Sequence, residues 1–146
     1  MKVKFTCFAS CILAGSLHIS SLSACPFELP VWKVDINGQK LKLEVAESLE
    51  ARQCGLSTRT VLAEDEGMLF IFPRTMPVAF WMHDTTLPLS IAFLDEKRHI
   101  VDIQTMTPGE TNVLYRSPGP VRYAIELNWD WFIRHTVKVG DFVSIK

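Results

Sequence analysis

The chain has 146 residues, of which 48% are hydrophobic and 21% charged, a composition typical of one globular domain and not of a disordered or fibrous chain. Its 15 Lys and Arg are balanced by 16 Asp and Glu, so no global basic field is available to attract nucleic acid. Length and charge therefore argue against a multidomain protein and against nucleic acid as a partner.

Residues 1–24 have the pattern of a signal peptide. Lys2 and Lys4 supply the positive charge, and the stretch that follows, up to Ile19, is mostly apolar. This stretch is shorter and more polar than the run of about 20 apolar residues that spans a bilayer. We therefore predict that the segment directs export across the inner membrane and is then removed.

The end of this segment resembles a lipoprotein cleavage motif. Residues 22–25 are Leu-Ser-Ala-Cys, and in such motifs the cysteine thiol accepts the lipid before cleavage. Cys25 would then anchor the protein to a membrane, with residues 25–30 as a short linker. Pro26 replaces the Asp that retains lipoproteins at the inner membrane of diderm bacteria, which favours the outer membrane. The alternative is ordinary cleavage before Cys25, without lipid, into the periplasm.

Two cysteines remain after cleavage, and their fates are coupled. An acylated Cys25 cannot form a disulfide, which leaves Cys54 as a lone thiol. If Cys25 is not acylated, an oxidising periplasm can join the two. Because Cys54 lies in a short helical pattern just before Gly55, we expect it to be a bystander and not a nucleophile.

The domain begins with a predicted β-hairpin. Val31–Ile36 and Leu41–Val45 alternate apolar and polar residues, and the Asn-Gly pair at 37–38 is typical of a type I′ turn. A short helix should follow, because Ser48 can cap its start and Gly55 can end it.

Short apolar runs continue through the rest of the chain. The predicted strands are Met68–Phe72, Val78–Met82, Leu89–Leu94, His99–Met106, Val121–Leu127 and Val137–Ile145. Pro73 should end the first of these strands, residues 107–120 should form a loop, and Asn128 should cap a helix of about eight residues. Many short strands at close spacing predict a mainly β (α+β) fold over residues 31–146, a single β-sandwich or small barrel-like domain with about two short helices.

Several motifs occur in a familiar order. They are Gly55-Leu56, Glu66-Gly67-Met68-Leu69-Phe70, Phe72-Pro73, Phe80-Trp81-Met82, Pro88-Leu89, Ile91-Ala92-Phe93-Leu94-Asp95, Arg122-Tyr123-Ala124-Ile125-Glu126-Leu127 and Val139-Gly140-Asp141. Together they resemble the family catalogued as domain of unknown function 192, over residues 40–146. The resemblance implies a small bacterial or archaeal protein, often secreted or lipid-anchored, with a mainly β sandwich-like domain, and it implies no activity.

The chain departs from that family pattern at positions that bear on chemistry. His83 and Asp84 stand where the family usually has a basic residue and Asn, and Ser90 stands where it often has Asp. The cysteines common in the family before its Tyr are absent from Thr107–Tyr115. A thiol role carried by those cysteines in relatives cannot operate here.

The strongest candidate for a binding site follows the second apolar run. Trp81, His83, Asp84, Thr85 and Thr86 place a ring, an imidazole, a carboxylate and two hydroxyls where a strand ends, as at a pocket mouth. This set suits a small polar ligand or a sugar. The alternative is that the tryptophan belongs to the core and the polar run is a β-turn.

Glu126 is a second candidate, because it interrupts an otherwise apolar strand. An ionised carboxylate cannot be buried without a partner, and Arg122 or Arg59 is the predicted partner. We expect Glu126 and Tyr115 to assist ligand binding at the same rim.

Other candidates have simpler explanations. Trp129 and Trp131 could form a stacking platform, but an apolar stripe on a short helix more often packs onto a sheet. His99 and His135 lack neighbours at ligand spacing, so no metal site is expected. The acidic run at residues 64–66 lacks the spacing of a calcium loop and is better explained as a solvated turn. No cofactor motif is present in the sequence.

Two hypotheses about function remain open, and the sequence does not decide whether the protein is an enzyme. The first is an envelope domain, tethered by Cys25, that binds a small polar ligand, a cell-wall fragment or a protein partner. The second is a periplasmic hydrolase or lyase in which His83, with Asp84 or Glu126, is the general acid and base. A solvent-open pocket that holds His83 and Glu126 would favour the enzyme, and a filled apolar one would favour binding.

Overall fold

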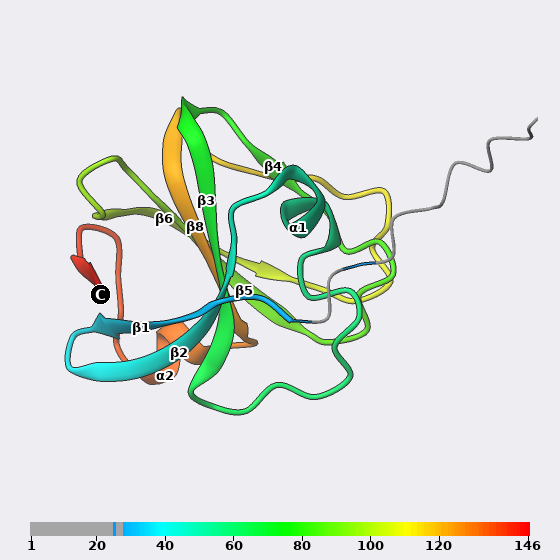
Figure 1. Cartoon of the computed structure of the whole chain (residues 1–146), viewed down its shortest axis with the longest axis horizontal. Helices are drawn as coiled ribbons and strands as arrows, with labels where there is room; N and C mark the ends of the chain where they lie inside the picture. The colour runs from blue at the N-terminus through cyan, green and yellow to red at the C-terminus, as the bar shows by residue number, and fades with distance from the viewer. Residues whose placement is uncertain (1–24, 26–27) are drawn as a thin grey trace, which may run out of the picture.

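The computed structural model describes Cys25 and residues 28–146. The predicted signal peptide, residues 1–24, and residues 26–27 of the predicted linker lie outside the described part. The described chain forms a curled seven-stranded sheet of half-barrel shape, a small two-stranded sheet and two short helices (Figure 1). The prediction of a mainly β fold with about two short helices is therefore confirmed.

The strands and helices of the described residues follow one another closely. They are β1 (Val31–Ile36), β2 (Gln39–Ala46), α1 (Leu49–Cys54), β3 (Glu66–Met76), β4 (Ala79–Phe80), β5 (Leu89–Leu94), β6 (Ile100–Met106), β7 (Tyr115–Arg116), β8 (Val121–Asn128), α2 (Trp131–Arg134) and β9 (Val143–Ile145). The large sheet has the order β6-β5-β8-β3-β2-β1-β9, and β4 pairs with β7. Only β2 and β3 run parallel among these pairs. Neither described helix has the length and apolar character needed to cross a membrane.

The first third of the domain forms as its sequence predicts. Asn37 and Gly38 have φ of 53° and 83°, the left-handed values that a type I′ turn requires. Ser48 caps α1, because its Oγ accepts a hydrogen bond of 3.1 Å from the backbone N–H of Ala51. Gly55 ends the helix with a φ of 52°, a conformation that favours glycine.

Several predicted boundaries are wrong. Pro73 does not end β3, because the register against β8 shifts between Ile71 and Met76 and such an irregularity tolerates a residue without an N–H. The predicted strand over residues 78–82 shrinks to two residues. Its short partner, β7, lies inside the predicted loop, and the final strand is limited to β9.

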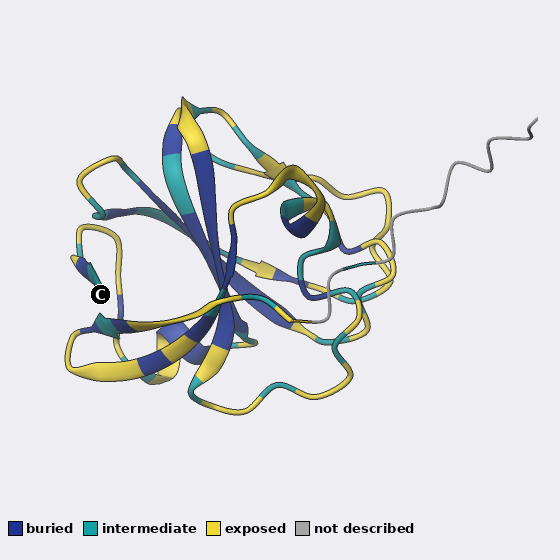
Figure 2. Cartoon of the chain, viewed as in Figure 1, coloured by how far each residue is buried: buried dark blue, intermediate teal, exposed yellow. Residues whose placement is uncertain are grey.

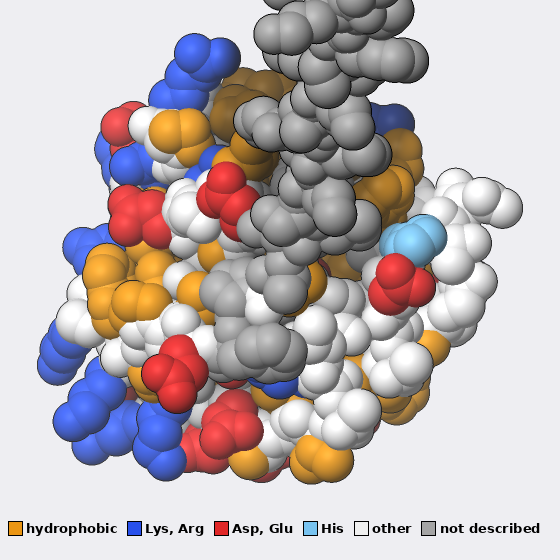
Figure 3. All heavy atoms as spheres, turned by 45° about the vertical axis from the view of Figure 1, so that its right-hand side comes forward, with side chains coloured by type: hydrophobic (Ala, Val, Ile, Leu, Met, Phe, Trp, Pro, Cys, Tyr) orange, Lys and Arg blue, Asp and Glu red, His pale blue; other side chains and the backbone are white. Residues whose placement is uncertain are grey.

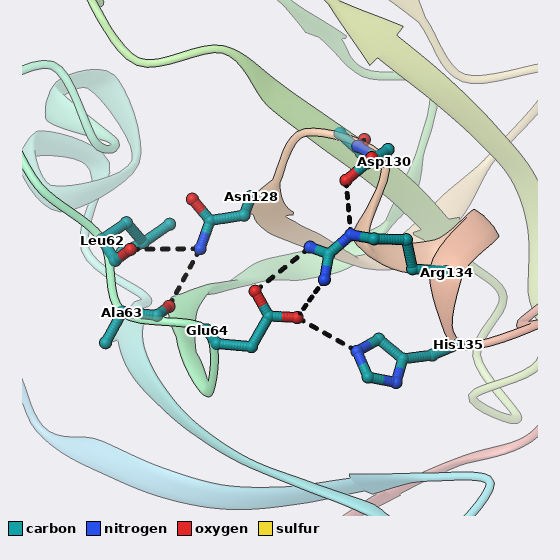
Figure 4. A network of polar contacts seen from close by, with 8 residues as sticks. Leu62, Ala63, Glu64, Asn128, Asp130, Arg134 and His135 are labelled. Atoms are coloured by element: carbon teal, nitrogen blue, oxygen red, sulfur yellow. Dashed lines mark hydrogen bonds and ion pairs between the residues drawn. The ribbon is translucent and has the colours of Figure 1, made fainter.

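The predicted eight-residue helix is also wrong. α2 has only four residues, and Asn128 does not cap it. The Asn128 side chain instead donates hydrogen bonds to the carbonyl oxygens of Leu62 and Ala63, which ties the loop before β3 to the end of β8 (Figure 4). Asp130, with φ of 60°, precedes the helix, and its side chain makes no capping hydrogen bond.

Two hydrophobic cores lie on opposite faces of the large sheet, because side chains alternate along each strand. We call one the α2 face, since Leu69 of β3 packs there with Trp131 and Phe132 of α2. We call the other the α1 face, since Met68 and Phe70 of β3 pack there with residues in and beside α1. Buried residues run along the central strands of the sheet (Figure 2).

Cys54, at the end of α1, forms a disulfide with Cys25, and their Cα atoms are 5.5 Å apart. Of the two outcomes that the sequence leaves open, the structure shows the disulfide, so Cys54 is not a lone thiol in this form of the chain. A sulfur in a disulfide cannot also carry a lipid, so the structure corresponds to the alternative in which Cys25 is not acylated. The bond ties the start of the described chain to the α1 face.

Candidate functional site

A pocket of about 360 Å³ lies on the α1 face, between α1, β3, β4 and β8. Its volume falls within the range of about 300–1,000 Å³ usual for small-molecule sites. Aromatic rings form much of its wall: Phe70 and Phe72 from β3, Phe80 from β4, and Trp81 directly after it. The ring of Phe80 meets Phe70 edge to face at 4.9 Å between centroids. The aromatic part of the wall therefore comes from β3, β4 and the residue after β4, and polar residues complete the lining.

The pocket exists because α1 does not fill the space above the sheet. Ala51 is the buried residue of this helix, and the residues after it, from Arg52 to Leu56, line the pocket. Gly55 keeps the gap open, since a Cβ built on it would lie 3.6 Å from Cζ of Phe70 and 3.9 Å from Oε2 of Glu126. The absent side chain at Gly55 thus exposes the deeper wall of the pocket.

Glu126 is the ionisable group of that deeper wall. It lies in the middle of the sheet, opposite Met68 of β3 and Ile91 of β5, and its side chain is only 5% exposed. Among the described residues, no hydrogen-bond or ion-pair partner contacts its carboxyl group. Burial raises the pKa of Glu126 from its ordinary value near 4.5 to about 8. At neutral pH the carboxyl group is therefore mostly protonated.

Neither predicted partner of Glu126 contacts its carboxyl group. The guanidinium of Arg59 forms a bidentate ion pair with the carboxylate of Glu44, a residue of β2, which is the neighbour of β3 in the sheet. The guanidinium of Arg122 lies 5.7 Å from the ring centroid of Tyr123, and its Nη1 has no hydrogen-bond partner among the described residues. The prediction of an Arg–Glu126 pair was wrong because strand alternation fixes a shared face and does not fix where long side chains end.

The polar run after β4 forms one side of the pocket mouth. His83 and Thr85 line the pocket, and the imidazole Nδ1 of His83 lies 2.9 Å from Oδ2 of Asp84. The backbone N–H of Thr85 donates to the carbonyl of Met82, so the run is also a turn. Asp84 and Thr86 are exposed and are not among the lining residues. The turn and the pocket rim, which the sequence presents as alternatives, are the same segment.

Trp81 is 58% exposed and lines the pocket, so the alternative that it belongs to the core is wrong. Its ring lies 5.6 Å from that of His83, centroid to centroid. Of the other two candidate tryptophans, Trp131 is 1% exposed and packs on the α2 face, as the core explanation predicts. Trp129 is 52% exposed and precedes α2, where it does not line the pocket.

Tyr115 lies away from the pocket. Its side chain is buried, and its hydroxyl donates to Oε2 of Glu110 at 2.7 Å and accepts from the N–H of Thr107 at 3.0 Å. Burial, followed by the nearby carboxylate of Glu110, raises the pKa of Tyr115. These contacts hold the loop after β6 in position, so the role of Tyr115 is structural.

Arg52 is the lining residue that sequence reasoning missed. Its guanidinium lies 5.7 Å from the ring centroid of Phe72, and its Nη1 donates to the carbonyl oxygens of Ile71 and Glu47. Those carbonyls hold it between α1 and β3. A basic residue in the last turn of a helix is common and gave no signal of a pocket.

The acidic run before β3 takes part in a second polar cluster, outside the pocket (Figure 4). Glu64 contacts both Arg134 and His135, and Arg134 also binds Asp130. Hydrogen bonds from Arg134, and then from His135, lower the pKa of Glu64. Within the described residues, no group of three potential ligands is arranged to hold a metal ion. The cluster fastens a loop to α2.

The surface carries no uniform charge on the face drawn in Figure 3, where acidic and basic side chains are intermixed with hydrophobic ones. This agrees with a formal net charge of −1 for the whole chain. On the part of this face that the described residues form, no broad region of one charge marks a site.

Fold and pocket together define a small half-barrel domain with a pocket on its α1 face. The family model of domain of unknown function 192 (DUF192), described as an uncharacterized ACR, matches residues 32–145. The chain belongs to this family, as its motifs indicate.

Two solved structures share the fold. One is from Sinorhizobium meliloti 1021 and is described as a proposed transcription regulator; it is 31% identical, with a TM-score of 0.78 over 82% of this chain and 97% of that one. The other, from Novosphingobium aromaticivorans DSM 12444, has no known function; it is 28% identical, with a TM-score of 0.76 over 80% of this chain and 86% of that one. No curated protein matches the chain.

Proposed function

We propose that this protein is a binding domain for a small molecule, and that the ligand occupies the pocket on the α1 face. The observation that supports this most is Glu126. Buried polar groups in proteins almost always have hydrogen-bond partners, and those that lack one need an explanation. Glu126 is 5% exposed and lines the pocket, and no described residue contacts its carboxyl group, so a molecule in the pocket can reach this group and supply a hydrogen-bond partner.

The pocket favours a small molecule over nucleic acid as the partner. Its wall of aromatic rings with a few polar groups is the usual composition of small-molecule sites. A nucleic-acid site would instead need a basic stripe, which a net charge of −1 does not favour. We therefore do not extend to this chain the description of the S. meliloti relative as a transcription regulator.

We further propose that the domain works after export, in the periplasm. The Cys25–Cys54 disulfide supports this, because disulfides persist in oxidising compartments and are rare in reducing ones. A lipid on Cys25 and this disulfide exclude each other in one molecule. Intact mass spectrometry of the protein from its host distinguishes them: the disulfide form carries no acyl mass, and an acylated Cys25 would make the protein an outer-membrane lipoprotein.

A thermal-shift screen of small molecules tests the binding function. A compound that binds the folded protein raises its stability by RT ln(1 + [L]/Kd). We expect hits on the parent that disappear in Trp81→Ala and persist in Trp129→Ala, a matched control because both tryptophans are about half exposed and only Trp81 lines the pocket. Hits that survive both substitutions would place the ligand elsewhere, and a screen without hits would contradict the proposal.

The second candidate is a hydrolase or lyase. It is favoured by the contact between His83 and Asp84, which orients the imidazole, and by the presence of His83 and Glu126 on one pocket. A carboxyl group with a pKa raised to about 8 is suited to donate a proton at neutral pH. Turnover of model esters or glycosides that falls at least about 100-fold in His83→Ala would support it. Equal turnover in parent and variant would rule it out.

A further inference from the structure

The Glu126 carboxyl group and the rings around it point to a particular class of ligand. An ionised carboxylate in an apolar wall is stable when a positive charge lies beside it. Among the described residues, the two arginines that alternation suggests, Arg59 and Arg122, do not supply that charge. The wall therefore contains an acid that keeps its proton at neutral pH and would ionise when a positive charge is placed beside it.

The same wall is rich in aromatic rings, whose faces attract cations. Phe70, Phe72, Phe80 and Trp81 all line the pocket, and Phe80 packs edge to face on both other phenylalanines. Phe72 already has a guanidinium, that of Arg52, 5.7 Å from its ring centroid. This protein thus uses one of these rings for a cation in its own chain.

Arg52 also shows where a ligand would not bind. Its Nη1 donates to the carbonyl oxygens of Ile71 and Glu47, which holds the positive charge at the α1–β3 side of the pocket. Arg52 and Glu126 both line the pocket, and no hydrogen bond or ion pair joins them in the described part of the chain.

We propose that the pocket binds an organic cation, an amine or a quaternary ammonium compound, with Glu126 as its counter-ion and the aromatic wall around its charged group. This inference rests on the proposed function, that the pocket binds a small molecule, and adds the chemical class of the ligand. The size of the pocket, about 360 Å³, suits a compound of this kind without a large attached group.

Calorimetric titration of the purified, disulfide-bonded protein with charged and uncharged analogues tests the inference. The probes are choline, tetramethylammonium and phenethylamine as cations, 3,3-dimethyl-1-butanol as the uncharged analogue of choline, and 3,3-dimethylbutyrate as an anion. We expect at least one cation to bind, and the alcohol to bind at least about tenfold more weakly than choline if choline is that cation. Glu126→Gln should weaken cation binding at least about tenfold and leave any weak binding of the alcohol unchanged. Trp81→Ala should also weaken it, and Trp129→Ala should not.

The outcomes separate this inference from the proposed function. If the alcohol or the anion binds as well as the cations, the pocket binds a small molecule and the ligand class is wrong; preferred binding of the anion would place it on Arg52. If none of the cations binds at millimolar concentration, the inference is overturned. If cations bind equally to the parent and to Glu126→Gln, the carboxyl group is not their counter-ion, and the inference is overturned as well.

Discussion

The two short helices pack differently on the α2 face and the α1 face of the large sheet. On the α2 face, Trp131 and Phe132 of α2 are large side chains, each 1% exposed, that pack on the sheet. On the α1 face, the buried residue of α1 is Ala51, and a pocket lies beside the helix, with Phe70 in its wall. The aromatic pocket with Glu126 thus lies beside the helix that buries the smaller side chain.

The two faces also differ in the chemistry of strand β8. Ile125 and Leu127 point to the α2 face, and Ala124 and Glu126 share the α1 face. A buried carboxyl group costs stability, and this cost falls only on the face that has a pocket. We infer that burial of Glu126 lowers the stability of the protein, and that the α1 face keeps this residue because it presents a polar group in the pocket.

The pH dependence of stability gives the largest expected effect. The folded protein keeps the proton of Glu126 up to about pH 8, whereas the unfolded chain loses it near pH 4.5. The free energy of unfolding should therefore fall as pH rises through this window, by up to about 5 kcal/mol from this group, and level off above it. Urea unfolding of the parent and of Glu126→Gln at several pH values measures this. The variant should lack this fall, and a parallel fall in both proteins would contradict the account.

Removal of the Trp131 side chain from the core of the α2 face should have the next largest effect on the free energy of unfolding. Trp131→Ala deletes a fully buried ring from a packed core, which typically costs about 3–5 kcal/mol. Urea unfolding at one pH gives the value. A loss below about 1 kcal/mol would mean that Trp131 is not packed in the core of the α2 face as described.

The disulfide tests how the α1 face is held. Cys25 and Cys54 are 29 residues apart in sequence, and a cross-link over a loop of this length stabilises a protein by about 3 kcal/mol. The double substitution of both cysteines by serine should lower the free energy of unfolding by about that amount, and the reduced parent should match it. Equal stability of the oxidised parent and the double variant would show that the bond does not constrain the chain.

The smallest expected effect on stability is that of Trp81→Ala, which compares a tryptophan of the α1 face with Trp131 of the α2 face. Trp81→Ala removes a ring that is 58% exposed, so the free energy of unfolding should change by less than about 0.5 kcal/mol, in contrast to Trp131→Ala. The effect of Trp81 should appear in ligand binding instead. A large destabilisation by Trp81→Ala would mean that this residue has a core role after all.

The sequence predicts elements whose signals are local. The Asn37-Gly38 turn, the Ser48 cap and the buried strand after Gly67 each depend on a few neighbouring residues, and all three form. The predictions failed where contacts between residues far apart in the sequence determine the local structure. Asn128 looks like a helix cap, but it bonds to the carbonyls of Leu62 and Ala63, more than 60 residues earlier in the chain.

The candidate site was predictable only in part, for the same reason. The rim residues Trp81 and His83 and the odd position of Glu126 stand out in the sequence, and the structure brings all three to one pocket. Nothing in the sequence indicates that Arg52 and Gly55 line a pocket, because their place in it depends on where α1 lies over β3. The absence of a partner for Glu126 is likewise a property of the folded arrangement, since arginines are present nearby in the sequence.

The ionisation of Glu126 tests the central claim most directly. Labelling the side-chain carboxyl carbons of glutamate with ¹³C and following the Glu126 signal by NMR between acid and alkaline pH measures its pKa in the folded protein. If the Glu126 carboxyl group is buried without a partner in the free protein, its pKa should be about 8. A pKa near 4.5 would show that the group is solvated or already paired, and would contradict the account of Glu126 as a buried acid without a partner, on which the proposed function rests.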